Sequence, residues 1–431
     1  MPFDLDLHPY LKRVLDRTYN HEIILKSLLH GAYDSNWLKE YELFYNKQTK
    51  SNPYVTRVLF KFKEKRGKSA GFSHIRPVTD GSELSETYLV PPKNLCAAND
   101  VYIKCLDEFD AYGERVECTP YIMPETIFGM CIHASIWICL KILEKRAMVE
   151  RSLSIPEIQN LARGSPYADR EGLLFKQAAR ILRMGRASSF YVINVESPRL
   201  TDMQMLMELY AYVESRLPVI IGVDIADLPW WRTDKHGYHS LVTIGHTMEE
   251  NRTNGFVFHD ESLLPYVTMK NDKLLKAWHI PTTQPPSRYV REMLVAVPPE
   301  VVLPFHSAYQ QFEKILSVFQ EKGVTSEKVE NLVIRPFLKG GSELFIETRN
   351  LSLLRALKEA QFPSHVWAFF LYDQNADRKD EKSLRGFFVR DATARTDLRF
   401  FFFMDEKKAI YQVEEGKVYT LHEGAKKRKI I

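Results

Sequence analysis

The chain has 431 residues, 45% of them apolar, with 59 Lys and Arg against 55 Asp and Glu and a net charge of +4. A chain of this length exceeds what one hydrophobic core usually supports, so we expect two or three domains. The small net charge disfavours nucleic acid or an anionic membrane surface as the main partner. The sequence also contains no run of about 18 apolar residues, which a helix would need to span a membrane.

The cysteines and the N-terminus together predict a location in the cell. The first residues, MPFDLDLHPYLKRV, lack the basic-then-apolar pattern of a secretion signal. The chain has five cysteines, at positions 96, 105, 118, 131 and 139, and no CxxC pair. An odd number of cysteines without an export signal favours reduced thiols in a cytoplasmic, bacterial-type protein. No histidine completes a zinc spacing, so we expect no metal and no cofactor.

Residues 1–94 are predicted to form an N-terminal accessory domain with both helices and strands. Helical patterns lie at 11–15 and 21–33, and the segment YVTRVLFKFKEK, from Tyr54, alternates apolar and polar residues as a strand does. The segments GKSAGFSHIRP and PPK are rich in Gly and Pro, and we interpret both as loops.

Residues 95–302 are predicted to form a second domain in which helices precede strands. The segment 131–145 is apolar nearly all round, which indicates a helix buried in the core. Three further helices are expected: one with a capping-box start at Ser154, one ending at Gly185 and one over 201–217.

Residues 303–431 are predicted to form a separate C-terminal α+β module without cysteine. In chain order we expect a helix at 307–320, a strand at 343–348, a helix at 351–360 and a strand at 366–372. The segment LRFFFFMD predicts a strand buried on both faces, and a hairpin with its turn at Glu415 and Gly416 closes the chain. This module could present a substrate, cover a site or bind a partner protein.

Cys131 is the candidate nucleophile. It stands where the helical pattern of 131–145 begins, just after Gly129. Unpaired N–H groups and the macrodipole at a helix N-terminus favour an anion, here a thiolate. The backbone N–H of Cys131 could also point at a developing oxyanion. Cys139, in the middle of the same apolar helix, is interpreted as a core residue.

His239 and Asp260 are the candidate base and its orienting group. Apolar strands are expected at 217–225, 239–247 and 255–262, the last two joined by the turn EENRTNG. His239 begins one strand of this hairpin and Asp260 lies near the end of the next, so their side chains could meet at one edge of the sheet. An Asp that accepts a hydrogen bond from an imidazole fixes its tautomer and stabilises the imidazolium, which in turn lowers the pKa of a nearby thiol.

Other histidines are alternatives to His239. His236, in the preceding loop, is the alternative base if the strand register differs from our reading. By the alternation of side chains along a strand, His246 and His259 should lie away from the site and have structural roles. His133 points away from Cys131 on a helix and is interpreted as a hydrogen-bonded core group or a neighbour of the site.

These motifs, in this order, resemble the papain-like cysteine peptidase superfamily and, within it, the bacteriocin leader-peptidase-like branch. The segments that carry the resemblance are GMCIHASIWICL, AYVESRLPVIIGV, GYHSLVTIGH and GFVFHDES. They lie within roughly 120–265, about a third of the chain. The resemblance implies an α+β fold with a papain-like core, in which a cysteine at the N-terminus of a central helix packs on an antiparallel sheet, here flanked by N-terminal and C-terminal α+β modules.

The resemblance also implies roles for the site residues. Cys131 would be the nucleophile, His239 the general base and acid, and Asp260 the orienting group. The family usually places a Gln a few residues before the cysteine to donate into the oxyanion hole, whereas this sequence has Glu125 and Thr126 there. A Glu donates only when protonated, so the oxyanion-hole donor is left open.

The expected function is hydrolysis of a peptide or isopeptide bond through a thioester at Cys131, with a peptide or protein as substrate. Two alternatives stay open. One is an amidase or an acyl or γ-glutamyl transferase that uses the same triad, because a thiol acyl-enzyme serves all of these reactions. The other is a papain-like binding or scaffold protein that has lost catalysis, which the missing Gln favours.

Overall fold

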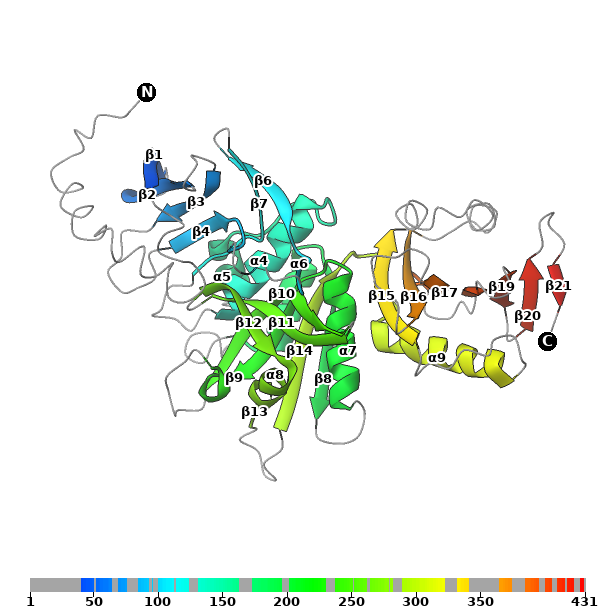
Figure 1. Cartoon of the computed structure of the whole chain (residues 1–431). Helices are drawn as coiled ribbons and strands as arrows, with labels where there is room; N and C mark the ends of the chain where they lie inside the picture. Colours follow the sequence, from blue (N-terminus) through cyan, green and yellow to red (C-terminus); the bar gives the residue numbers. More distant parts are fainter. Residues whose placement is uncertain are drawn as a thin grey trace. The chain divides into compact units, whose positions relative to one another are not determined.

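The computed structural model describes the chain in segments, which carry the helices and strands labelled in Figure 1. The described segments are 40–49, 52–63, 69–75, 84–92, 95, 100–111, 114–123, 131–162, 173–195, 201–229, 237–250, 252–261, 264–278, 280–281, 289–321, 332–340, 364–373, 384–394, 400–404, 409–414, 417–421 and 427–429.

Contacts between Cα atoms divide the chain into two compact units. The first contains Met1–Leu200, Leu217–Thr247 and Asn254–Ala296, and the second contains Thr201–Arg216, Met248–Thr253 and Val297–Ile431. The division into three domains, 1–94, 95–302 and 303–431, stays a prediction. The prediction assigns Thr201–Arg216, Met248–Thr253 and residues 297–302 to the domain 95–302, whereas these segments belong to the second unit.

The N-terminal part of the first unit contains a four-stranded antiparallel sheet. Its strands follow chain order: β1 (Glu40–Thr49), β2 (Asn52–Lys63), β3 (Ser69–Ile75) and β4 (Leu84–Leu89). The strand expected from Tyr54 is therefore confirmed as β2, while the loop expected over GKSAGFSHIRP is wrong where β3 runs. The reason lies in Gly71, which has φ +135° and no room for a Cβ against the carbonyl oxygen of Tyr88. This glycine permits a close approach of β3 to β4 and does not mark a turn.

A larger sheet of eight strands carries the rest of the first unit. Its main path runs β12-β11-β10-β9-β14-β13, with β5 paired to β10 and β8 paired to β14. The bounds are β5 (Val101–Ile103), β8 (Ser188–Val195), β9 (Val219–Asp224), β10 (Tyr238–Glu249), β11 (Arg252–Asp260), β12 (Leu264–Lys270), β13 (Ile280–Pro281) and β14 (Tyr289–Val297). The three strands expected at 217–225, 239–247 and 255–262 are confirmed as β9, β10 and β11.

Helix α4 (Cys131–Lys145) has an apolar surface nearly all round and lies against β9 of this sheet. The helix begins and ends where the sequence predicts. Two further predicted helices, α5 (Ile155–Ala162) and α6 (Phe175–Met184), pack against α4. The backbone N–H of Ser154 donates to the Glu157 side chain at 2.8 Å, which confirms the capping-box start of α5. The first unit also contains α8 (Asn271–Ala277) and the hairpin of β6 (Asp107–Ala111) and β7 (Glu114–Cys118).

In its described residues, the second unit combines two helices with a seven-stranded antiparallel sheet in chain order. The helices are α7 (Asp202–Glu214), capped by Thr201, and α9 (Phe305–Glu321). The strands are β15 (Leu332–Gly340), β16 (His365–Asp373), β17 (Leu384–Asp391), β18 (Phe400–Met404), β19 (Ala409–Glu414), β20 (Lys417–Leu421) and β21 (Lys427–Lys429). Phe312 of α9 stacks on Phe369 of β16 with ring centroids 5.0 Å apart, which joins helix and sheet in one core.

The C-terminal predictions have mixed outcomes. Four elements are confirmed: the helix near 307–320 as α9, the strand near 366–372 as β16, the phenylalanine-rich strand as β18 and the closing hairpin as β19–β20. The burial of β18 on both faces lies outside what the structure describes and stays a prediction. The strand at 343–348 and the helix at 351–360 lie outside the described residues, as do the N-terminal helices at 11–15 and 21–33. The chain thus has an α+β fold, with helices and antiparallel sheets, as predicted. No helix in the described segments is long and apolar enough to cross a membrane.

Candidate active site

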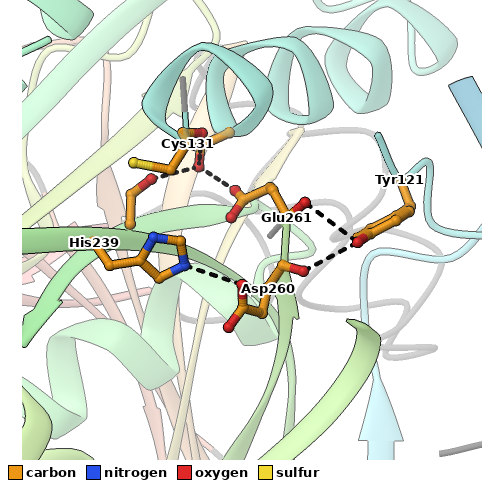
Figure 2. A network of polar contacts seen from close by, with 7 residues as sticks. Tyr121, Cys131, His239, Asp260 and Glu261 are labelled. Carbon is orange, nitrogen blue, oxygen red and sulfur yellow. Dashed lines mark hydrogen bonds and ion pairs between the residues drawn. The ribbon is translucent and has the colours of Figure 1, made fainter. Parts of the chain in front are cut away.

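Cys131 is the first residue of α4 and keeps part of its surface exposed. Figure 2 shows its sulfur in the first turn of the helix, on the side that faces the His239 ring. The N-terminus of α4 has no acidic residue in its first turn, so no carboxylate there competes with a thiolate for the N–H groups and the helix dipole.

His239 and Asp260 meet at one edge of the eight-stranded sheet. His239 is the second residue of β10 and pairs with Val223 of β9, while Asp260 is the last residue of β11. Because β10 and β11 are neighbouring strands joined by a short turn, the start of one lies beside the end of the other. His239 Nε2 lies 3.0 Å from Asp260 Oδ1, and the Asp260 side chain is fully buried.

The structure therefore brings together the three residues that the sequence singled out. His239 Nε2 faces Asp260, which leaves Nδ1 on the side of the ring that Figure 2 shows toward Cys131. The interaction with His239 lowers the pKa of the Cys131 thiol, and the interaction with Cys131 raises the pKa of His239. A sulfur, an imidazole and a carboxylate are thus connected in that order.

The electrostatics of this arrangement favour a thiolate and imidazolium pair. Burial lowers the pKa of His239, but the charge and hydrogen bond of Asp260 and the hydrogen bond to Cys131 outweigh it and hold that pKa well above its usual value. Burial likewise raises the pKa of the Cys131 thiol, yet the hydrogen bond and charge of His239 and two hydrogen bonds from Ser240 leave it below its usual value. The two shifts widen the pH range in which both groups are charged.

Several polar groups at this site were missed by the sequence reasoning. Ser240 donates to Cys131 from both its side chain and its backbone N–H. Ser135, one turn into α4, contacts the Ser240 hydroxyl at 3.1 Å and also hydrogen-bonds the carboxyl of Glu261. The hydroxyl of Tyr121 donates toward the carbonyl oxygens of Asp260 and Glu261, at 3.2 and 3.4 Å (Figure 2). Ser and Tyr next to apolar runs give no distinctive signal in a sequence. Glu261 directly follows Asp260 at the end of an apolar strand, and this pair of carboxylates could have been noticed.

Glu261 is fully buried beside Asp260. The pKa of the Glu261 carboxyl lies well above its usual value. Burial raises it most, and the negative charge of Asp260 raises it further. The positive charge of His239 and the hydrogen bond from Ser135 lower it, but by less. A carboxyl in this setting favours its neutral form.

One group of side chains in the described part of the chain has spacing that could suit a metal ion. Ligand atoms of His239, Asp260 and Glu261 all lie within 4.8 Å of one another. The hydrogen bond of His239 Nε2 to Asp260 Oδ1 and the contact of Glu261 with Ser135 already explain this spacing, so the cluster follows from the polar network itself.

The competing histidines lie elsewhere. His246 stacks on Tyr102 of β5 with ring centroids 5.4 Å apart. His259 is packed between the rings of Tyr121 and Tyr266, and burial lowers its pKa to about 3. His133 is buried in α4, and burial lowers its pKa to about 4.

The other described cysteines, Cys105, Cys118 and Cys139, are buried. Burial raises the pKa of both Cys118 and Cys139 above the usual value. Positions 96, 125, 126, 129 and 236, which include the alternative base and the oxyanion-hole candidates, lie outside the described residues.

No protein-family model matches the chain, and no curated protein matches its sequence. The chemistry of Cys131 and its neighbours therefore carries the functional proposal.

Proposed function

We propose that the protein is a thiol-dependent hydrolase that cleaves a peptide or isopeptide bond, with Cys131, His239 and Asp260 as its catalytic triad. One observation carries the proposal: a partly exposed thiol with a lowered pKa is hydrogen-bonded to an imidazole, which is in turn held by a buried carboxylate. Burial alone would raise the pKa of Cys131, so the lowered value reflects its polar neighbours, as in a nucleophile that must be ionised near neutral pH.

In the proposed reaction, Cys131 Sγ attacks the carbonyl carbon of the scissile bond and forms a tetrahedral intermediate. The backbone N–H groups at the start of α4 stabilise its oxyanion. The intermediate collapses to a thioester when the C–N bond breaks and the His239 imidazolium gives its proton to the leaving amine. His239 then takes a proton from water, whose oxygen attacks the thioester, and the acid product leaves as Cys131 regains its starting state. Asp260 holds the imidazole in the tautomer that this sequence needs.

The papain-like core is part of the proposal. In its support, the cysteine begins a buried helix, that helix lies on an antiparallel sheet, and the base and the orienting residue follow from two neighbouring strands in the order Cys, His, Asp. An extended peptide or protein segment is the proposed substrate, and the C-terminal α+β module is the proposed binding site for a protein partner.

Selective alkylation tests the proposal. Limiting iodoacetamide at pH 7, followed by digestion and mass spectrometry, should modify Cys131 at least about tenfold faster than Cys118 and Cys139, because only the thiolate reacts. His239→Ala should slow the alkylation of Cys131 at least about tenfold, since it removes the base and the positive charge, although Cys131 stays more accessible than the buried thiols. His306→Ala is the matched control: His306 also bonds a carboxylate, that of Glu208, but belongs to the second unit, and its loss should leave the preference unchanged.

A second candidate is a papain-like binding or scaffold protein without catalysis, which the absence of a Gln before Cys131 favours. Alkylation of Cys131 at the same slow rate in the natural protein and in His239→Ala would support the scaffold and exclude the hydrolase. If Cys131 is selectively reactive, peptide and amide libraries with hydroxylamine as a competing acceptor separate hydrolysis from amidase or transferase activity, with Cys131→Ala as the inactive control.

A further inference from the structure

The hydroxyl of Ser135 is the centre of a polar network beneath the thiol. Its Oγ lies 3.1 Å from the carbonyl oxygen of Cys131, 3.1 Å from the hydroxyl of Ser240 and in a short contact with Oε1 of Glu261. Hydrogen bonding from Ser240 in turn lowers the pKa of the Cys131 thiol. A continuous path of hydrogen bonds therefore runs from the Glu261 carboxyl through two hydroxyls to the proposed nucleophile.

The protons available decide how these contacts are made. The carbonyl oxygen of Cys131 can only accept, a thiolate can only accept, and each serine hydroxyl donates one proton. With Glu261 ionised, the two hydroxyl protons must serve both of these acceptors and the carboxylate as well. At least one close oxygen–oxygen contact then lacks a proton. A proton on Glu261 relieves most of the conflict. The carboxyl then donates to Ser135, the two hydroxyl protons serve the carbonyl oxygen and the thiolate, and only the 3.1 Å contact between the two serine hydroxyls is left without a proton.

The surroundings of Glu261 also favour a neutral carboxyl. The side chain is fully buried, and its Oε2 has no hydrogen-bond partner among the described residues. The titratable groups that face it are its neighbour Asp260 at the end of β11, His239 on β10 and Cys139 on α4. The charge of Glu261 contributes to the raised pKa of Cys139. Cys131 and the phenol of Tyr121 complete the set around the network. An ionised Glu261 would be unfavourable for two reasons. One of its buried oxygens has no hydrogen-bond donor among the described residues, and its negative charge would lie beside that of Asp260.

We propose that Glu261 is a positioning residue, which carries a proton in the working enzyme, donates it to Ser135 and so directs the hydroxyl of Ser240 onto the sulfur of Cys131. The inference rests on the proposed function, because it assigns Cys131 as the nucleophile. With Glu261 neutral, the negative groups beside the imidazolium are the Asp260 carboxylate and the Cys131 thiolate, and no second buried carboxylate opposes the thiolate. Glu261 touches no reacting atom and acts through the two serines.

Infrared difference spectroscopy of the full chain tests the protonation directly. The spectrum of the natural protein minus that of Glu261→Gln at neutral pH should contain the carbonyl stretch of a protonated carboxylic acid. If the difference contains only carboxylate bands, Glu261 is ionised and the inference is wrong. This readout needs no catalysis, so it separates failure of the inference from failure of the proposed function.

The rate of Cys131 alkylation as a function of pH tests the positioning. Glu261→Gln keeps a neutral donor to Ser135 and should retain most of the rate, with the acid limb of the profile unshifted. Glu261→Ala leaves the serine hydroxyls undirected and should lower the rate about tenfold and move the acid limb to higher pH, as should Ser240→Ala, because each weakens a hydrogen bond to a charged group. Thr243→Val, which removes another buried hydroxyl of β10, is the matched control and should change neither.

Two results would overturn the assignment. An acid limb that moves to lower pH in Glu261→Gln would mean that a negative charge had been removed from beside the thiolate. A rate in Glu261→Ala equal to that of the natural protein would mean that the network does not direct Ser240. If Glu261→Ala does not fold, Glu261→Gln and Ser240→Ala still decide the question.

Discussion

The Asp260 carboxylate acts on Cys131 only through the His239 ring. Its charge raises the pKa of His239, and the resulting imidazolium lowers the pKa of the thiol. Each of these residues sits where burial alone would oppose its charged form, so the charges depend on one another. The removal of one of these charges should therefore change the pKa of a neighbouring residue by a measurable amount.

Asp260→Asn should make Cys131 a weaker nucleophile while keeping a side chain of the same shape. Without the carboxylate, the pKa of His239 falls and the pKa of the Cys131 thiol rises, so the alkylation profile moves to higher pH. At pH 7 we expect a loss of about tenfold, which corresponds to a rise of about one unit in the thiol pKa. Asp272→Asn, in α8, should leave the profile unchanged, and an unaltered profile in Asp260→Asn would contradict the proposed link.

His259 should make the folded chain sensitive to acid. Burial lowers its pKa to about 3, against about 6.5 in the unfolded chain. Between pH 6.5 and 3, His259 is therefore protonated in the unfolded chain and neutral in the folded chain. The free energy of unfolding falls as the pH falls through this range. At pH 5 this costs about 2 kcal/mol of the free energy of unfolding.

His259→Phe keeps a ring between Tyr121 and Tyr266 and should remove this part of the acid loss, measured by urea unfolding at pH 7 and pH 5. His306→Phe is the control: the hydrogen bond with Glu208 raises the pKa of His306, so its loss should not reduce the acid sensitivity. Equal acid losses in the natural protein and in His259→Phe would disprove the prediction.

At the scale of elements, strand pairing places the base and its orienting group, and a separate helix places the thiol. Runs of apolar residues and a turn signal were enough to predict α4 and the strands β9, β10 and β11. The positions of His239 and Asp260 near strand ends followed from these. Strands β8, β12 and β14 were not predicted, because nothing in their sequence distinguishes a strand from any short apolar run until the neighbouring strands are known. The contacts of Ser135 and Glu261 could not be predicted either, because they depend on how α4 lies over β10 and β11.

Gly245 tests the strand pairing of the eight-stranded sheet. It lies in β10 opposite Ile103 of β5, and a Cβ there would come within 2.5 Å of the Tyr102 carbonyl oxygen and 2.8 Å of Ile103 Cα. Gly245→Ala should therefore cost about 1–3 kcal/mol of the free energy of unfolding, measured in urea, because backbone must move.

Cys131 alkylation in Gly245→Ala should persist, since His239 is at the other end of β10. Gly185→Ala provides the comparison: there a Cβ would meet the Leu140 side chain, which can shift, and the Leu182 carbonyl oxygen, both only at 3.3 Å. The cost should stay below about 1 kcal/mol. Similar costs for the two substitutions would mean that β5 does not hold β10 as described.

At the scale of the whole molecule, α7 belongs to the same unit as the C-terminal sheet, although it precedes the site strands in sequence. The hydroxyl of Tyr212 accepts from the Phe305 backbone N–H at 3.0 Å, and that of Ser215 accepts from the Leu338 N–H at 2.7 Å. The buried Glu214 carboxylate pairs with Arg335 of β15. The segment Thr201–Arg216 thus lies in sequence between two parts of the first unit, which carries the site, but packs in the second unit.

Glu214→Ala should destabilise the second unit selectively. It leaves the Arg335 guanidinium, about 22% exposed, without its partner, which should cost about 3 kcal/mol. Hydrogen exchange followed by mass spectrometry should show faster exchange in β15 and β16 than in the natural protein, with β9 and β10 unchanged.

Glu150→Ala is the control for this substitution, because Glu150 and Arg186 are both well exposed and their pair should contribute less than about 1 kcal/mol. An equal acceleration of exchange in all the sheets would show that the two units unfold together.

The contrast among the thiols also gives the protein an internal reference. Cys105, Cys118 and Cys139 are sealed in the folded interior while Cys131 is open to reagent. Label on the three sealed thiols in a digest therefore reports the share of molecules that have unfolded, and label on Cys131 reports native reactivity. Each variant can in this way be corrected for misfolding within a single sample, without a second assay.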